Sequence, residues 1–306
     1  MKGQGGGDRN CRGRQRGMGR LVRNAGGLNN PGRLMYSSRC GDLVQDRVLV
    51  TLQPSEQRRG LGAGTGEGMT VVVDKSDRRV RQMFGEIAPN YDRMNHLLSM
   101  QTDRYWRWRT TRIVPPRGGA PILDVCTGTG DLAIAYYRAA GGACPVVGSD
   151  FCPEMLELAR RKQARRRIGD DLRFIEADAQ QLPFPDDHFQ IVSVAFGLRN
   201  VADTDRGLRE MTRVCRPGGQ IAVLEFSMPR WQPFRWVYGL YFRHCLPRIG
   251  QWLARNNASA YEYLPASVGE FPAGEELAQR MRNAGMAQVR YHSLTLGVAT
   301  LYVGTK

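Results

Sequence analysis

The sequence predicts an α/β fold, a doubly wound and mostly parallel seven-stranded sheet that ends in an antiparallel C-terminal hairpin. From Pro121 onward, short apolar runs alternate with longer amphipathic segments. Strands that alternate with helices build parallel sheets with helices on both faces. The last two apolar runs have no helical segment between them. Because a parallel connection needs a crossover, these two strands should pair antiparallel.

A helical prelude, residues 77–112, precedes the sheet. Its apolar residues recur every three or four positions, break at Ala88-Pro89, where proline cannot continue a helix, and then resume. The apolar residues before the break are Val80, Met83, Phe84 and Ile87.

Seven apolar runs define the strands. In order they are 122–126, 146–150, 172–176, 189–195, 220–225, 289–294 and 299–303. The helices expected among the first five strands are 131–140, 153 to about 167, and 204–214. Gly297 lies in the short connection between the last two strands, where a hairpin turn is expected.

The first 68 residues differ in composition from the rest. They hold 12 Lys and Arg against 5 Asp and Glu, so 12 minus 5, or +7, of the net charge of +15 lies here, together with 16 of the 36 glycines. Such a segment cannot bury enough apolar surface to offset its ordering entropy. We therefore expect residues 1–68 to be disordered and residues 69–306 to form one domain.

Three origins of this extension compete. An RNA-binding Gly/Arg tail would carry aromatic residues for base stacking, yet only Tyr36 is present. An organelle transit peptide would be rich in serine and poor in acids, which this segment is not. We favour upstream sequence translated from a misplaced start, with Met69 as the true initiator.

Cysteines, histidines and apolar runs exclude several classes of protein. The seven cysteines are odd in number and contain no C-x-x-C pair, which argues against a disulfide framework or zinc knuckle and favours a reducing, cytoplasmic compartment. The histidines lack metal-ligand spacing, so we expect no metal site. No apolar run approaches the roughly 18 to 20 residues that span a bilayer.

The first strand, the glycine turn after it and the following helix form the candidate nucleotide-binding corner. Its pattern is Asp124-x-x-x-Gly128-x-Gly130. In a Rossmann-like sheet, such a turn lets a ligand touch the backbone, and the helix N-terminus offers unpaired N–H groups. Asp150, at the end of the second strand, can accept hydrogen bonds from both ribose hydroxyls.

Asp178 and Ala179 follow the third strand, where an acid can accept from an adenine amino group and a small residue can offer its N–H. The glycine pattern also suits a dinucleotide oxidoreductase, or a plain tight turn. Asp124 favours S-adenosylmethionine, because its carboxylate can hold the amino-acid end of that cofactor and would repel a pyrophosphate. The terminal hairpin also suits the class I methyltransferase variant of the sheet.

Ordered motifs carry a resemblance to a known family. They are 91–99 with Trp106, 182–186, 196–201, 213–227 and 246–250. The first, Tyr-Asp-Arg-Met-Asn-His-Leu-Leu-Ser, resembles the first signature of the ubiquinone/menaquinone biosynthesis C-methyltransferases. The fourth, which begins Arg-Val-Cys-Arg-Pro-Gly-Gly, resembles the second signature. The resemblance covers about residue 70 to the C-terminus.

This resemblance implies methyl transfer from S-adenosylmethionine to a ring carbon of a polyprenyl quinol. Demethylmenaquinol to menaquinol is the favoured reaction, and benzoquinol methylation in ubiquinone biosynthesis is the alternative. Asp103 departs from the family pattern, which usually has His there, and Cys215-Arg216 replaces an aliphatic-Lys pair. The implied cofactor contacts are Thr129, Asp150, Asp178, Ala179 and Ala195, the last in place of a serine.

Methylating a quinol ring needs a stabilised phenolate beside the sulfonium, and needs no metal. Arg199 and Asn200 follow the fourth strand, where ligands of open sheets collect, and Tyr91 could close over the site from the prelude. We hypothesise that Arg199 stabilises the phenolate, directly or through a water that takes the proton. The alternative is a structural Arg199 paired with a carboxylate at the sheet end.

A polyprenyl tail also predicts contact with an anionic membrane. Segment 231–252 is amphipathic, aromatic and basic, which suits a membrane interface, although a core-packing helix would look similar. The basic run 160–167 is expected to be a solvated face, with lipid contact as the less favoured alternative.

We expect a peripheral enzyme at the inner face of the cytoplasmic membrane, with a homo-oligomer left open and no nucleic-acid partner. The rival interpretations are a methyltransferase for another small molecule and an RNA-associated protein acting through its tail.

Overall fold

The computed structural model describes residues 77–88, 91–229, 231–241 and 267–306. By its internal contacts the chain divides into two units, Met1–Gly66 and Glu67–Lys306. All described residues belong to the second unit. The expected disorder of residues 1–68, and Met69 itself, lie outside the described residues.

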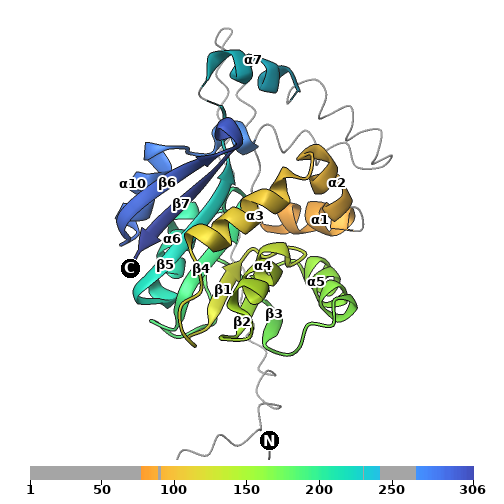
Figure 1. Cartoon of the computed structure of the whole chain (residues 1–306), viewed down its shortest axis with the longest axis vertical. Coiled ribbons are helices and arrows are strands. Elements are labelled where there is room, and N and C mark those ends of the chain that lie inside the picture. Colours follow the sequence, from red (N-terminus) through yellow and green to blue (C-terminus); the bar gives the residue numbers. More distant parts are fainter. Residues whose placement is uncertain (1–76, 89–90, 230, 242–266) are drawn as a thin grey trace, which may run out of the picture. The chain divides into compact units, whose positions relative to one another are not determined.

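A seven-stranded sheet forms the centre of this second unit (Figure 1). Its order is β3-β2-β1-β4-β5-β7-β6. Strands β1 to β5 pair in parallel, whereas β7 runs antiparallel to both β5 and β6. The predicted fold, with its antiparallel C-terminal hairpin, is confirmed. The strands are β1 Ile122–Val125, β2 Val146–Asp150, β3 Leu172–Glu176, β4 Phe189–Ala195, β5 Cys215–Phe226, β6 Ala287–Leu294 and β7 Ala299–Thr305.

The strand order reverses between β1 and β4. From β1 the chain proceeds outward to β2 and β3, and from β4 it proceeds the other way to β5. Ligands of open α/β sheets bind in the crevice that such a reversal leaves at the carboxyl ends of the strands. A ligand-binding site is therefore expected at the carboxyl ends of β1 and β4.

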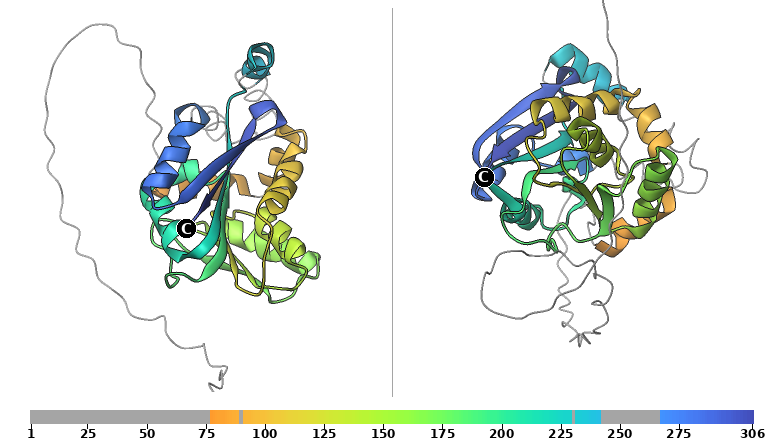
Figure 2. Two further views of the ribbon diagram at one scale, coloured as in Figure 1. Left: turned by 60° about the vertical axis from the view of Figure 1, so that its left-hand side comes forward. Right: turned by 60° about the horizontal axis from the view of Figure 1, so that its bottom comes forward.

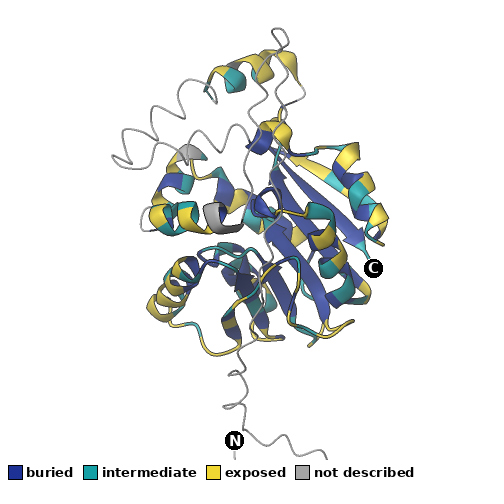
Figure 3. Ribbon diagram, turned by 180° about the vertical axis from the view of Figure 1, so that it is seen from behind, coloured by how far each residue is buried: buried dark blue, intermediate teal, exposed yellow. Residues whose placement is uncertain are grey.

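Helices cover both faces of the sheet (Figure 2). One core contains Ile122 with residues of α3, α4 and α5, and the other contains Leu123 with residues of α6 and α10. Neighbouring residues of β1 thus enter opposite cores, as the period of two in a strand requires. Figure 3 shows the central strands dark blue, whereas the edge strand β6 and the outer helix faces are largely yellow. The helices are α3 Thr102–Ile113, α4 Asp131–Ala140, α5 Pro153–Arg165, α6 Thr204–Val214 and α10 Glu275–Asn283.

The predicted helical prelude is three helices rather than two. Beside α3 these are α1 (Asp77–Ile87) and α2 (Tyr91–Leu98). The break at Ala88-Pro89 was predicted, and the second, at Met100 and Gln101, was not. Both residues have positive φ, 50° and 62°. This left-handed turn redirects the chain without a glycine or proline, so nothing in the local sequence marks it.

Two further boundaries differ from expectation. Strand β5 begins at Cys215 rather than at residue 220, because its early part pairs with β4 across a register shift between Phe189 and Ile191. Helix α10 was not predicted, although its Leu277, Ala278 and Met281 are fully buried against α6 and the sheet.

Segment 231–252 is described only up to residue 241, so its remaining residues lie outside the description. Its helix is α7, Gln232–Leu240. Phe234 and Tyr238 pack against the core, whereas Trp231 and Trp236 are 63% and 69% exposed. Within the described part of the chain, every helix is too short or too polar to cross a bilayer.

Candidate functional site

The glycine turn between β1 and α4 can only be built with glycine at its end. Gly130 has φ of 81°, and a Cβ there would lie 2.6 Å from the ring of Phe174. Gly128 has φ of 55°, and its N–H donates to Asp150 Oδ2 at 2.7 Å. The turn is thereby fastened to the end of β2, next to the sheet crevice.

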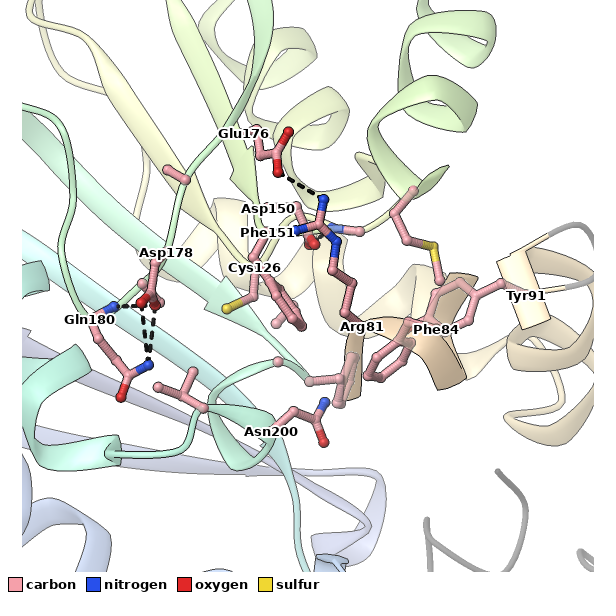
Figure 4. A pocket seen from close by; sticks show the side chains of 18 residues that line it. Arg81, Phe84, Tyr91, Cys126, Asp150, Phe151, Glu176, Asp178, Gln180 and Asn200 are labelled. Carbon is pink, nitrogen blue, oxygen red and sulfur yellow. Dashed lines mark hydrogen bonds and ion pairs between the residues drawn. The ribbon is translucent and has the colours of Figure 1, made fainter. Parts of the chain in front are cut away.

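A cavity of about 290 Å³ lies at this crevice (Figure 4). Its walls come from α1, α2 and the loops that follow β1, β2, β3 and β4. Thus one cavity collects predicted site residues from distant parts of the sequence. Those that line it are Tyr91, Gly128, Asp150, Asp178, Ala179, Ala195 and Asn200.

Asp150 is buried at the floor of the cavity. Besides the Gly128 N–H, its carboxylate accepts from the Cys152 N–H at 3.0 Å. Burial raises the pKa of this carboxyl to about 6, and the backbone donors, which favour the charged form, offset only part of that effect. An acceptor fixed in this way is ready to receive the hydroxyls of a ligand.

Two further acids form the outer wall of the cavity. Glu176 pairs with Arg81 of α1 at 3.0 Å, and Figure 4 shows this pair at one end of the cavity. Asp178 is exposed and accepts from the N–H of Gln180 at 2.8 Å. The N-terminal helices and the sheet therefore meet across the site.

Asp124 does not line this cavity. It is 1% exposed and accepts from Thr127 Oγ1 at 2.6 Å, Ser193 Oγ at 2.8 Å and the Ala133 N–H at 3.1 Å. Burial raises the pKa of Asp124 to about 6. It lines instead a much smaller cavity of about 30 Å³, which shares Tyr91, Gly128 and other lining residues with the larger one.

Arg107 of α3 also lines the small cavity, and sequence reasoning missed it. Its Nη1 donates to the buried Asp103, which also accepts from His96 Nδ1 and Ser99 Oγ, each at 2.8 Å. Burial alone would raise the pKa of Asp103, but the Arg107 guanidinium and the Ser99 hydrogen bond lower it. Asp103, which departs from the family pattern, thus orients Arg107. The four-residue spacing of the pair on a predicted helix was the available signal.

Thr129 belongs to a network that joins three elements. Its hydroxyl donates to Asp92 of α2 and accepts from Lys162 Nζ of α5 at 3.0 Å. Lys162 also pairs with Asp92 and with Asp131 of α4, both at 2.7 Å. Lys162 is only 8% exposed. The expectation that run 160–167 is a solvated face is therefore wrong for Lys162, which holds α2 against the glycine turn.

Tyr91 and Asn200 reach the cavity, whereas Arg199 is not among its lining residues. Arg199 is buried, pairs with Glu225 at 2.9 Å and donates to the Phe196 carbonyl. Its Nε has no partner in the part of the chain that is described. The phenolate role of Arg199 stays a prediction, and its contacts match the structural alternative.

Among the residues that the structure describes, no three or more His, Cys, Asp or Glu are grouped closely enough to hold a metal ion.

The fold has solved counterparts. The cyclase SpnF superposes with a TM-score of 0.56 at 16% identity, over 76% of this chain and 96% of that one. A methyltransferase from Thermotoga maritima superposes with a TM-score of 0.51 at 19% identity, over 74% and 99%. Because one of the two is a cyclase, the fold leaves the reaction open. Fold and glycine-turn site together define the architecture of a class I methyltransferase.

Sequence comparison gives the family. The model of the ubiE/COQ5 methyltransferase family matches residues 71–306, and the chain belongs to this family. Membership in this family implies that the cofactor is S-adenosylmethionine.

Three relatives illustrate the similarity. Demethylmenaquinone methyltransferase of Deinococcus radiodurans is 47% identical over 79% of this chain and 99% of the relative. That of Thermus thermophilus is 49% identical over 73% and 100%. The ubiquinone/menaquinone biosynthesis C-methyltransferase UbiE of a Geobacter species is 42% identical over 76% and 99%.

Proposed function

We propose that this enzyme transfers a methyl group from S-adenosylmethionine to a ring carbon of a polyprenyl quinol, converting demethylmenaquinol to menaquinol. One observation carries the proposal. Two relatives named demethylmenaquinone methyltransferase are matched over 99% and 100% of their own length at 47% and 49% identity. Nearly every segment that those enzymes possess therefore has a counterpart here.

The residues of the site fit S-adenosylmethionine. The large cavity offers the buried carboxylate of Asp150 for ribose hydroxyls, and Asp178 with Ala179 for the edge of the adenine. Gly128 has no side chain to separate a ligand from the backbone, and the nearest atom to a Cβ there would be the Tyr91 ring at 4.0 Å. These groups match an adenosine. The carboxylates of Asp150, Glu176 and Asp178 would repel a phosphate group.

The amino-acid end of the cofactor is assigned to the small cavity. Arg107 can pair with an α-carboxylate there, and Asp124 and Asp131 line the same cavity and can face an ammonium group. No described residue accepts from the other two nitrogens of Arg107. The small cavity therefore offers a zwitterion both a cation and carboxylates.

When bound, the cofactor supplies an electrophilic methyl group on a positively charged sulfur. The protein must place the quinol ring in line with it and stabilise the phenolate. Burial raises the pKa of Tyr91, so its hydroxyl stays protonated at neutral pH and can donate to the phenolate. Asn200 lines the same cavity. Arg199 does not line the cavity and acts as a positioning residue, because it holds the turn before Asn200 through the Phe196 carbonyl.

The test is methyl transfer by the purified full chain. With S-adenosylmethionine and a short-chain demethylnaphthoquinol under reducing conditions, we expect methylated product by mass spectrometry. A benzoquinol assayed in parallel tests the second candidate, which the relative named UbiE at 42% identity favours. Binding of S-adenosylhomocysteine without methylation of either quinol would contradict the proposal and favour another small-molecule substrate.

We further propose that the enzyme meets its substrate at the cytoplasmic face of an anionic membrane. The exposed Trp236 of α7 and Trp231 just before this helix suit such an interface. The described cysteines Cys126, Cys144, Cys152 and Cys215 are all free, as in a reducing compartment.

A further inference from the structure

A second large hollow, the arginine groove of about 840 Å³, runs between α3, α4 and Arg166 just after α5. It shares no lining residue with the 290 Å³ cavity, and it shares only Arg107 and Asp131 with the small cavity. Its charged lining is strongly one-sided. The charged members are Arg104, Arg107, Arg112, Arg138, Arg166 and a single acid, Asp131.

Most of these cations lack a counter-ion. Arg107 is paired with Asp103, and Asp131 is already paired with Lys162. In the described ranges, no carboxylate forms an ion pair with the remaining four arginines, and all four are exposed. They are Arg104, Arg112, Arg138 and Arg166. Four like charges facing one hollow repel one another, and an anionic ligand would relieve that repulsion.

Amphipathic aromatic side chains accompany the charges. Trp108 lines the groove, is 49% exposed, and lies 5.6 Å from the Arg112 guanidinium. Tyr105, three residues earlier on the same helix, is 46% exposed. Met100, in the turn before α3, is 76% exposed. Exposed aromatic rings beside arginines are typical of surfaces that lie at the level of lipid headgroups.

We propose that the arginine groove binds the phosphate groups of anionic phospholipids and so seats the enzyme on a bilayer. The proposal rests on the proposed function, since a polyprenyl quinol is dissolved in lipid. The unpaired arginines come from three separate elements, which suits several headgroups side by side better than one small phosphate. The exposed ring of Trp108 in the groove gains nothing from a free phosphate, but it can lie among lipid headgroups.

The experiment is co-sedimentation of the full chain with phosphatidylcholine vesicles, with and without phosphatidylglycerol. The test variant is Arg104→Glu/Arg112→Glu/Arg138→Glu. The matched control is Arg173→Glu/Arg209→Glu/Arg290→Glu, which changes the net charge equally at exposed positions outside the groove. We expect binding only with phosphatidylglycerol. The groove variant should lose on the order of a hundredfold in affinity, and the control much less.

Further measurements distinguish phospholipid binding by the groove from binding through net charge, of a free phosphate compound or of RNA. Equal losses in both triple variants would overturn it, because net charge alone would then explain binding. Vesicle binding unaffected by the groove variant would also overturn it. So would displacement of the protein from vesicles by millimolar pyrophosphate at constant ionic strength, or single-stranded RNA binding that the groove variant abolishes while vesicle binding persists. These last two results would identify a free phosphate compound or a nucleic acid as the ligand.

The result can be told apart from a failure of the proposed function. In detergent, the groove variant should bind S-adenosylhomocysteine and methylate a short-chain quinol as the wild type does, which also shows that it is folded. Loss of vesicle binding with these activities intact supports the groove. A wild type that binds vesicles through the groove but methylates no quinol would contradict the proposed function alone.

Discussion

At the scale of single residues, the site depends on charged groups that come from separate elements. Asp124, Asp150 and Arg107 belong to a strand, a strand end and a helix, and each is held by hydrogen bonds before any ligand arrives. Preorganised charges of this kind bind a complementary ligand without reorganising. Arg107 gives the sharpest test, because we propose that it contacts the amino-acid end of the cofactor and not the adenosine end.

Replacing Arg107 by Met should weaken S-adenosylhomocysteine binding about tenfold to a hundredfold, the range for a lost charge-assisted hydrogen bond. Methylthioadenosine, which lacks the amino-acid end, should bind as to the wild type. Arg107→Lys should fall between, since it keeps the charge but loses the fork. Calorimetry with both ligands checks this. Equal losses for the two ligands would mean that Arg107 supports the fold and does not bind the carboxylate.

At the scale of elements, α2 is fastened to the nucleotide corner by one buried cation. Lys162 connects Asp92 of α2 with Asp131 of α4 and with Thr129 in the glycine turn. Tyr91, the residue before Asp92, lines the 290 Å³ cavity. Whatever holds Asp92 therefore also places Tyr91 over the site.

Lys162→Met should lower the free energy of unfolding by about 2–3 kcal/mol, because it leaves two carboxylates without their buried partner. Adding Asp92→Asn should recover part of the loss. The control is Arg161→Met, whose exposed pair with Glu157 should contribute no more than about 0.5 kcal/mol. Urea unfolding measures all of these. Equal effects of the Lys162 and Arg161 variants would contradict the network.

At the scale of the whole molecule, the buried acids connect the site to the stability of the domain. Burial raises the pKa of Asp124 and of Asp150 to about 6 from 3.8. The folded protein therefore holds these protons more tightly than the unfolded chain. This contribution to stability is present below about pH 4 and is lost as pH rises through about 6.

The free energy of unfolding that these two groups contribute should thus decrease between about pH 4 and pH 7, by about 1–3 kcal/mol per group. Asp124→Asn removes one titrating group, so the variant should show a shallower decrease than the wild type across this range. Urea unfolding curves at several pH values provide the comparison. Parallel pH profiles for wild type and variant would show that Asp124 does not titrate in this window.

Much of the site could be predicted because it follows β-strands. Gly128, Asp150 and Asp178 lie at or just beyond the ends of strands, and parallel strands bring their carboxyl ends to one edge. Arg107 and Lys162 could not be found in this way. Each lies on a helix among several other basic residues, and the packing of the folded chain decides that Lys162 is the buried cation of its run and that Arg107 reaches the small cavity.

The sequence by itself determined the sheet, the helices of the nucleotide corner and the family, because hydrophobic periodicity and local motifs are properties of neighbouring residues. Only the tertiary structure decided that Asp124 faces a separate small cavity, that Arg199 pairs with Glu225, and that Lys162 is buried. It also joined arginines of three elements into one groove. Burial and charge pairing depend on residues distant in the chain, so they exist only once the chain has folded.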